Sequence, residues 1–231
     1  MSVLNDPALE RMLARLHARS SGQLDEMRSY FTNQGDERQA DNDGRRRKFL
    51  SDKMVSLDRD KAEFCYQLCR ATNARSIVEV GTSFGVSTLY LAAAIRDNVR
   101  SDHSSGRVIG TEYEPLKAAA ARKNVAEAGL SEFIELREGD LRETLRRIDV
   151  KIDFVLVDIW IEMARSAIEL IFPHLRSGAS VVCDNTGQFR SDYQDYFQFI
   201  HDPKHGFRTM TLPFEGGLEL SVKAECTAGW K

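Results

Sequence analysis

The stretch EVGTSFGVS, residues 79–87, lies where a short apolar segment gives way to a helical pattern. Residues 76–80 are expected to form a strand and residues 83–95 a helix. Gly81 and Gly85 let the backbone turn tightly and approach a ligand, and the free N–H groups at the start of the helix suit a negatively charged group. The alternative is a glycine turn that binds no ligand. The acid Glu79, two residues before Gly81, argues against this alternative.

The same alternation of strand and helix continues on the C-terminal side of this stretch. Strands are expected over 76–80, 108–112, 133–136, 152–157 and 180–183, with helices over 58–73, 83–95, 115–128, 141–148 and 163–172. Short apolar strands separated by helices predict a parallel sheet covered on both faces. Residues 207–212 and 218–222 predict two further strands around a glycine turn. The predicted fold is α/β: a Rossmann-like, mostly parallel seven-stranded sheet with an antiparallel C-terminal pair and additional N-terminal helices.

The bulk composition excludes several classes of protein. The chain has 231 residues, 42% of them hydrophobic, and a formal net charge of −3, so it lacks the basic field of a nucleic-acid-binding protein. Its apolar runs are too short to span a membrane, and its N-terminus lacks a secretory signal pattern. We expect a cytoplasmic protein whose four cysteines are reduced, and Cys65 and Cys69 are interpreted as core residues.

Three regions are expected along the chain. Residues 1–50 form an N-terminal helical extension that either caps the substrate side or makes a dimer contact, and a homodimer is expected. Residues 51–226 form the main domain, and residues 227–231 are a loose tail. The polar stretch 33–44 is the one expected linker.

Acidic residues end the predicted strands. Ligands in open parallel sheets bind at the carboxyl ends of the strands, so these side chains are expected to converge on one edge. They are Glu79 near the end of the first strand, then Glu112, Asp140, Asp158 and the pair Asp184-Asn185. Glu112 is placed to accept hydrogen bonds from a ribose diol. It lies 112 − 81 = 31 residues after Gly81, against about 20 in the dinucleotide fingerprint, because the polar insert 97–106 lengthens the connection.

A subset of these residues suggests a metal ion. Asp158, Asp184 and Asn185 offer two carboxylates and an amide carbonyl, a donor set suited to a hard cation such as Mg²⁺, with Mn²⁺ or Ca²⁺ as alternatives. An Asp-Asn pair after a strand also forms turns without any metal, and that interpretation stays open.

Taken together, five segments resemble a known family: EVGTSFGVS, TEYEP, FVLVDIW, VVCDN and LPFEGGLELSVK. They are similar to class I S-adenosylmethionine-dependent methyltransferases, and within these to the cation-dependent O-methyltransferases of the catechol and caffeoyl-CoA type. The resemblance covers roughly residues 50–224. It implies a small phenolic substrate, such as a flavonoid or caffeoyl compound, and S-adenosylmethionine with Mg²⁺ as cofactors.

The resemblance also implies roles for individual residues. The residues that it places around the cofactor are Leu57, Glu79, Gly81, Thr82, Ser83, Ser87, Glu112, Tyr113, Asp140, Leu141 and Asp158. Asp158, Asp184 and Asn185 would act in catalysis through the metal, and Trp160 would wall the substrate pocket. Catechol-type members commonly place a lysine base where this chain has Ile161, so no general base is identified. Lys53 and Lys61 are interpreted as solvated helix lysines.

Three alternatives remain at this point. A nicotinamide-dependent oxidoreductase is less favoured because the chain lacks a G-x-G-x-x-G pattern. A metal-independent methyltransferase would use Asp158 and Asp184 for the cofactor and the fold. A non-catalytic cofactor-binding protein would fit the absence of a base.

Overall fold

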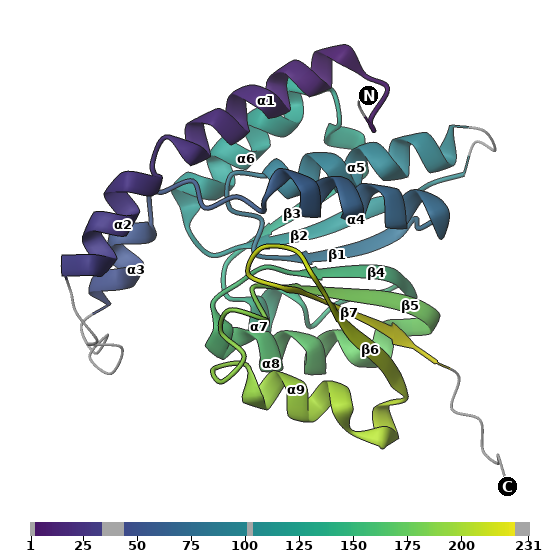
Figure 1. Cartoon of the computed structure of the whole chain (residues 1–231). Helices are drawn as coiled ribbons and strands as arrows, with labels where there is room; N and C mark the ends of the chain where they lie inside the picture. The colour runs from purple at the N-terminus through teal and green to yellow at the C-terminus, as the bar shows by residue number, and fades with distance from the viewer. Residues whose placement is uncertain (1–2, 34–43, 101–103, 225–231) are drawn as a thin grey trace, which may run out of the picture.

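The computed structural model describes residues 3–33, 44–100 and 104–224. One seven-stranded sheet organises it, in the order β3-β2-β1-β4-β5-β7-β6 (Figure 1). Strands β1 to β5 are parallel neighbours, and β6 and β7 close the sheet in antiparallel pairing. The strands are β1 (Ser76–Val80), β2 (Arg107–Glu112), β3 (Ile134–Glu138), β4 (Ile152–Val157), β5 (Leu175–Asp184), β6 (Phe207–Leu212) and β7 (Leu218–Lys223).

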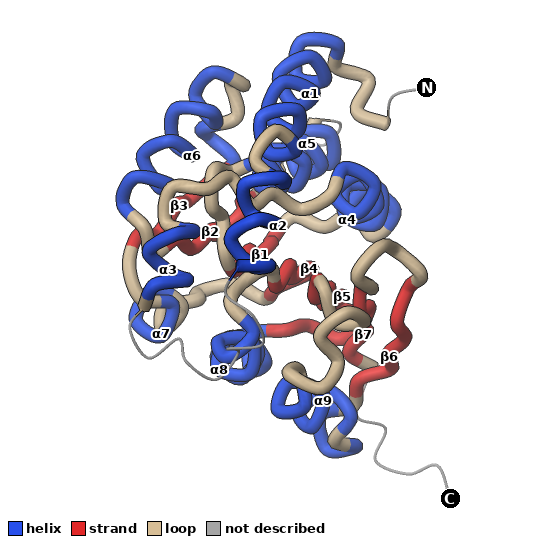
Figure 2. The backbone as a smooth tube through the Cα atoms, turned by 60° about the vertical axis from the view of Figure 1, so that its left-hand side comes forward, coloured by secondary structure: helices blue, strands red, loops and turns tan. Residues whose placement is uncertain are grey.

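Helices cover both faces of the sheet (Figures 1 and 2). The larger α-helices are α1 (Pro7–Ser21), α2 (Leu24–Asn33), α4 (Arg59–Ala71), α5 (Val86–Val99), α6 (Pro115–Glu127), α8 (Ile161–Ile171) and α9 (Gln194–His201). Two shorter ones are α3 (Arg45–Leu50) and α7 (Leu141–Thr144). Helices α1, α4, α5 and α6 share one apolar cluster with the sheet, and α7, α8 and α9 share the other. No helix of the described ranges is both long and apolar enough to cross a membrane.

The apolar side of α1 joins the first cluster. Leu9, Met12, Leu13 and Leu16 recur at helical spacing and are all buried there. Asp6 caps the N-terminus of helix α1, because its carboxylate accepts the Leu9 N–H at 3.1 Å. The first helix therefore packs on the same core that supports the central strands.

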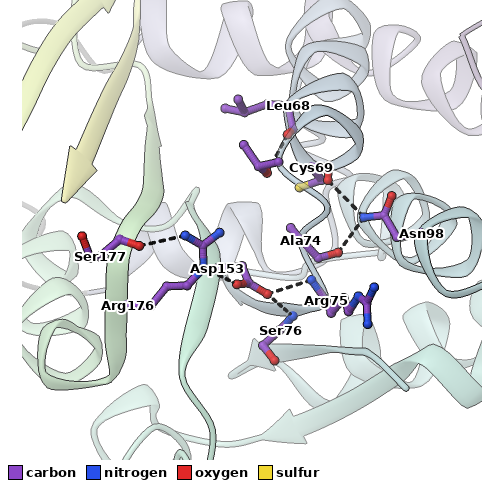
Figure 3. A network of polar contacts seen from close by, with 10 residues as sticks. Leu68, Cys69, Ala74, Arg75, Ser76, Asn98, Asp153, Arg176 and Ser177 are labelled. Carbon is purple, nitrogen blue, oxygen red and sulfur yellow. Dashed lines mark hydrogen bonds and ion pairs between the residues drawn. The ribbon is translucent and has the colours of Figure 1, made fainter. Parts of the chain in front are cut away.

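An acid at the opposite end of the strands is fully engaged in structure (Figure 3). Asp153, near the start of β4, accepts the N–H groups of Arg75 and Ser76 at 2.8 and 2.9 Å and the Arg176 guanidinium at 2.5 Å. It ties the starts of β1, β4 and β5 together. The carboxyl ends of β1 and β4, by contrast, border a cavity.

The structure confirms the predicted fold class. The seven strands, the parallel set and the antiparallel ending are present, and Cys65, Cys69 and Cys183 are buried free thiols. Helix α9 was not predicted, and α7 is only one turn where residues 141–148 were expected. The predicted tail 227–231 and most of the predicted linker lie outside the described residues.

Candidate functional site

A small cavity lies where β1 and β4 run side by side. Strand connections leave in opposite directions at this point, because β2 lies beyond β1 and β5 lies beyond β4; this is where open α/β sheets bind ligands. The cavity and the open space at its mouth together have a volume of about 210 Å³. Its walls come from the loop before α4, from the β1–α5 turn and from the end of β4: Met54, Val55, Ser56, Leu57, Gly81, Thr82, Ser83, Phe84, Val86, Ser87 and Asp158.

The β1–α5 turn has an unusual backbone. Gly81 has φ of 96°, and a Cβ added there would lie 1.9 Å from the Asp158 carbonyl oxygen. Only glycine lets β1 and β4 approach this closely. Ser83 also has positive φ, at 50°, which is uncommon outside glycine and concentrates at functional sites.

The Ser83 hydroxyl is a candidate ligand donor. It borders the cavity, is buried, and has no hydrogen-bond partner within the described ranges. Buried hydroxyls in folded proteins nearly always have a partner. A bound molecule in this cavity would supply one.

Glu79 organises the turn from beneath. It is fully buried and accepts the hydroxyls of Thr82 at 2.9 Å, Ser87 at 2.7 Å and Thr88. Burial raises the pKa of Glu79 above its ordinary value, against the opposing effect of the three hydroxyls. Glu79 therefore fixes two cavity residues, Thr82 and Ser87, from behind.

Glu112, at the end of β2, is hydrogen-bonded to the same turn. Its two carboxylate oxygens accept the N–H groups of Ser83 at 2.7 Å and Glu114 at 2.8 Å. Each oxygen keeps a further acceptor position. Glu112 can thus hold the Ser83 backbone and still accept hydrogen bonds from a ligand.

The interpretation of Lys61 as a solvated lysine is wrong. Lys61 is 1% exposed, in the first turn of α4, and its Nζ lies 2.8 Å from Asp184 Oδ1 and 2.9 Å from Asp58 Oδ2. Both contacts are ion pairs. Burial alone would lower the pKa of Lys61, but the two carboxylates outweigh it and raise this pKa, so Lys61 is an ammonium at neutral pH.

Asp158 and Asp184 end neighbouring strands and influence each other's charge. Burial raises the pKa of Asp158, and the carboxylates of Asp184 and Glu79 raise it further, while Lys61 opposes them. Asp158 keeps some exposure because it borders the cavity. Burial also raises the pKa of Asp184, and the Lys61 ammonium again acts in the opposite direction.

The arrangement does not fit a divalent cation on Asp158, Asp184 and Asn185. Asp184 Oδ1 faces the Lys61 ammonium, and Oδ2 accepts the Asn185 amide N–H at 2.8 Å. The Asn185 amide oxygen faces the other way, so that a Cβ on Gly216 would lie 2.7 Å from it. No group of three or more His, Cys, Asp or Glu side chains in the described ranges is placed to hold a metal ion.

The other predicted site residues lie outside the lining of this cavity. Tyr113 is 61% exposed, after the end of β2. Asp140 caps α7 and pairs with Arg142, whose hydrogen bonds lower the pKa of Asp140 to about 2. Leu141 packs into the second core cluster, as does the partly buried Ile161. Trp160 precedes α8, and the Arg46 guanidinium lies 5.2 Å from the centre of its ring.

Several site residues were missed from the sequence. The Thr88 hydroxyl donates to Glu79, as the hydroxyls of Thr82 and Ser87 do. Its position directly after Ser87 in the sequence was the available signal. Lys61 shares a helix face with Cys65, four residues on, and that buried stripe was the available signal. Met54, Val55 and Ser56 belong to an irregular loop, whose path no sequence period indicates.

Comparisons with known proteins find methyltransferases. A family model described as a methyltransferase domain matches residues 78–186. A catechol O-methyltransferase of Niastella koreensis is 30% identical over 139 residues, 57% of this chain and 58% of that protein. One of Mycobacterium tuberculosis is 31% identical over 132 residues, 57% of each chain. The chain thus spans little more than half the length of these curated relatives.

A solved structure resembles the fold. An O-methyltransferase of Bacillus cereus, crystallised in complex with SAH, superposes with a TM-score of 0.64. The two chains are 22% identical, and the superposition covers 73% of this chain and 82% of the other.

Proposed function

We propose that the chain is an S-adenosylmethionine-dependent O-methyltransferase, because residues 78–186 match a family model described as a methyltransferase domain and catechol O-methyltransferases are among the relatives. It moves a methyl group to a hydroxyl of a small phenolic or catechol-like molecule. One observation carries the cofactor part of the proposal: the cavity at the β1/β4 edge is lined by Ser83, whose buried hydroxyl has no hydrogen-bond partner among the described residues. The phenolic substrate class rests on the relatives.

The residues around the cavity suit the parts of this cofactor. Ser83 and the N–H groups at the start of α5 would receive its carboxylate. Glu112, with acceptor positions left on both oxygens, would hold its ribose hydroxyls. Leu57, Gly81 and Ser87 would flank its methionine part, and Asp158 would accept its amino group.

When bound, S-adenosylmethionine supplies a methyl group on a positively charged sulfur, which a substrate oxygen can attack in line. The chain's main contribution is alignment of the two molecules. Gly81 fixes the distance between β1 and β4, and Glu79 fixes the hydroxyls of the turn. Trp160, with Arg46 against its ring, would wall the substrate side beneath the N-terminal helices.

Assistance by Mg²⁺, Mn²⁺ or Ca²⁺ is a second form of the proposal. In its favour, Asp158, Asp184 and Asn185 come from the adjacent ends of β4 and β5. Against it stands the Lys61 ammonium on Asp184. Turnover of a catechol after removal of metals with EDTA separates the two forms, because an enzyme that needs the cation loses its activity.

The first test is cofactor affinity, with a matched pair of acids. Glu112 and Glu138 face each other in register on β2 and β3, but Glu138 pairs with Arg122 at the surface. We expect Glu112→Gln to weaken S-adenosylmethionine binding at least about tenfold, the loss of a charge-assisted hydrogen bond, and Glu138→Gln to leave it unchanged. Isothermal titration calorimetry measures both.

The same titrations separate the alternatives. Tight binding of NAD without binding of S-adenosylmethionine would contradict the proposal in favour of an oxidoreductase. Binding of S-adenosylmethionine without methylation of any member of a broad phenol panel would favour a non-catalytic binding protein. The expected homodimer also belongs to the proposal, and sedimentation velocity tests it.

A further inference from the structure

Lys61 lies outside the segment that matches the methyltransferase domain, residues 78–186, yet it reaches that segment's acidic edge. It enters from the first turn of α4, and its side chain is 1% exposed. Its Nζ stands between Asp58, the residue before α4, at 2.9 Å, and Asp184 at the end of β5, at 2.8 Å. A long lysine side chain is rarely buried this completely unless its charge is paired.

The ammonium stands where a divalent cation would have to bind. Asp184 is the acid that the sequence assigns to a metal, and each of its oxygens already faces a donor group, Lys61 or the Asn185 amide. A dication brought to the same carboxylate would meet a fixed positive charge within a few ångströms, in a region of low effective dielectric constant.

We propose that Lys61 is the built-in cation of this site: its ammonium neutralises Asp184 in place of a metal and closes the acid set to divalent ions. Lys61 is a positioning residue here, since it holds Asp184, next to Asp158, in a fixed orientation. Any consequence of Lys61 for methyl transfer rests on the proposed function. Its effect on metal binding can be measured without any substrate.

The test uses the full chain, freed of metals with EDTA and exchanged into buffer. Binding of Mn²⁺ is followed by the electron paramagnetic resonance signal of the free ion. We expect the wild type to bind no stoichiometric Mn²⁺ at concentrations up to about 1 mM, a weak limit for protein sites of this kind. Lys61→Gln removes the charge and keeps a side chain of similar length. We expect this variant to bind one Mn²⁺ ion per chain, at least about tenfold more tightly than the limit of about 1 mM set for the wild type.

Two variants serve as controls. Lys61→Arg keeps the positive charge and is expected to exclude Mn²⁺ like the wild type. Lys53→Gln removes another ion-paired lysine, which contacts Glu26 at 3.0 Å and Asp52 at 3.2 Å instead of the acidic edge. It is also expected to leave Mn²⁺ binding unchanged.

Several outcomes would overturn the proposal. One is stoichiometric Mn²⁺ binding by the wild type as tight as that of Lys61→Gln. Another is a folded Lys61→Gln protein, judged by circular dichroism, that binds no more metal than the wild type. If Lys61→Gln does not fold, the wild type decides: absence of binding supports the proposal, and one bound ion per chain overturns it. Failure to methylate any phenol would count against the proposed function alone.

Discussion

Glu79 keeps a carboxylate in the interior by drawing three hydroxyl donors from the turn that follows β1. Hydrogen bonds to an ionised group are stronger than neutral ones, and here they compete with the cost of burial. Burial prevails, since the pKa of Glu79 lies above its ordinary value of 4.5. The charge at this position therefore lowers the stability of the fold while it orients Thr82 and Ser87.

The raised pKa of Glu79 gives a pH-dependent prediction. Below the unfolded pKa of 4.5, both states hold the proton and Glu79 adds no dependence. As pH rises from there through the folded pKa, the unfolded state releases its proton first, so the contribution of Glu79 to stability falls. The Glu79→Gln variant has no titratable group at this position, so this pH-dependent contribution to stability is absent from it.

Urea unfolding at about pH 5 and about pH 8 tests this difference. We expect the stability advantage of wild type over Glu79→Gln to be larger at the lower pH, since the groups that do not interact with Glu79 cancel in the comparison. An advantage that grows with pH would show that the hydroxyls outweigh burial and lower this pKa instead.

Gly81 and Gly129 form a matched pair of glycines. Both have positive φ, 96° and 67°, but only at Gly81 would a Cβ meet another strand's backbone; at Gly129 nothing lies within 4 Å. We expect Gly129→Ala to cost about 1–2 kcal/mol from backbone strain. Gly81→Ala should cost more than about 3 kcal/mol, because β1 and β4 must separate.

The free energy of unfolding in urea measures both glycine variants. Equal costs at the two positions would mean that the strand pair gives way easily. The close approach of the Gly81 turn to Asp158 would then not be what requires glycine.

Residue patterns predicted the turn better than they predicted its surroundings. The glycines and the acids at strand ends are local features, and the structure brings Gly81, Ser83 and Asp158 to one cavity. The burial of Lys61 depends on its ion pair with Asp184 at the end of β5, a contact between residues far apart in the chain. A charged residue in the first turn of a helix is most often solvated, so the general tendency was misleading here.

At the scale of elements, α1 is the instructive case. The sequence predicted a helical extension over residues 1–50, and the apolar stripe of α1 packs into the same cluster as α4 and α5. Helix α9 was missed although Tyr196, Phe197, Phe199 and Ile200 are buried in the second cluster. Its start lacks a side-chain cap, so no local signal marked it. The long β5 was predicted only over its buried second half.

The docking of α1 gives a prediction with an internal control. Leu13 is 1% exposed within the first cluster, whereas Leu24 on α2 is 44% exposed. We expect Leu13→Ala to lower the free energy of unfolding by about 2–5 kcal/mol through lost burial and a cavity. Leu24→Ala should change it by less than about 0.5 kcal/mol.

Thermal or urea unfolding of the two leucine variants measures both changes in the free energy of unfolding. If Leu13→Ala proves as mild as Leu24→Ala, α1 is an appendage whose packing adds little to the domain. A large loss would make the first helix an integral part of the fold.

At the scale of the whole molecule, alternation of strands and helices determined the class of fold, because parallel strands need a helix to return the chain. The order of the strands was not determined by that alternation. It follows from the right-handed crossovers and from which apolar faces find partners in space. The β1/β4 edge, and with it the cavity, is a product of that order.

The strand order also has a consequence for how the chain is made. The cavity joins Gly81 to Asp158, 158 − 81 = 77 residues later. At synthesis rates of about 5–20 residues per second, the second wall emerges roughly 4–15 s after the first. During that interval the edge of β1 that later receives β4 has no partner. The nascent chain must therefore be protected from aggregation for longest at the strand that will later form its site.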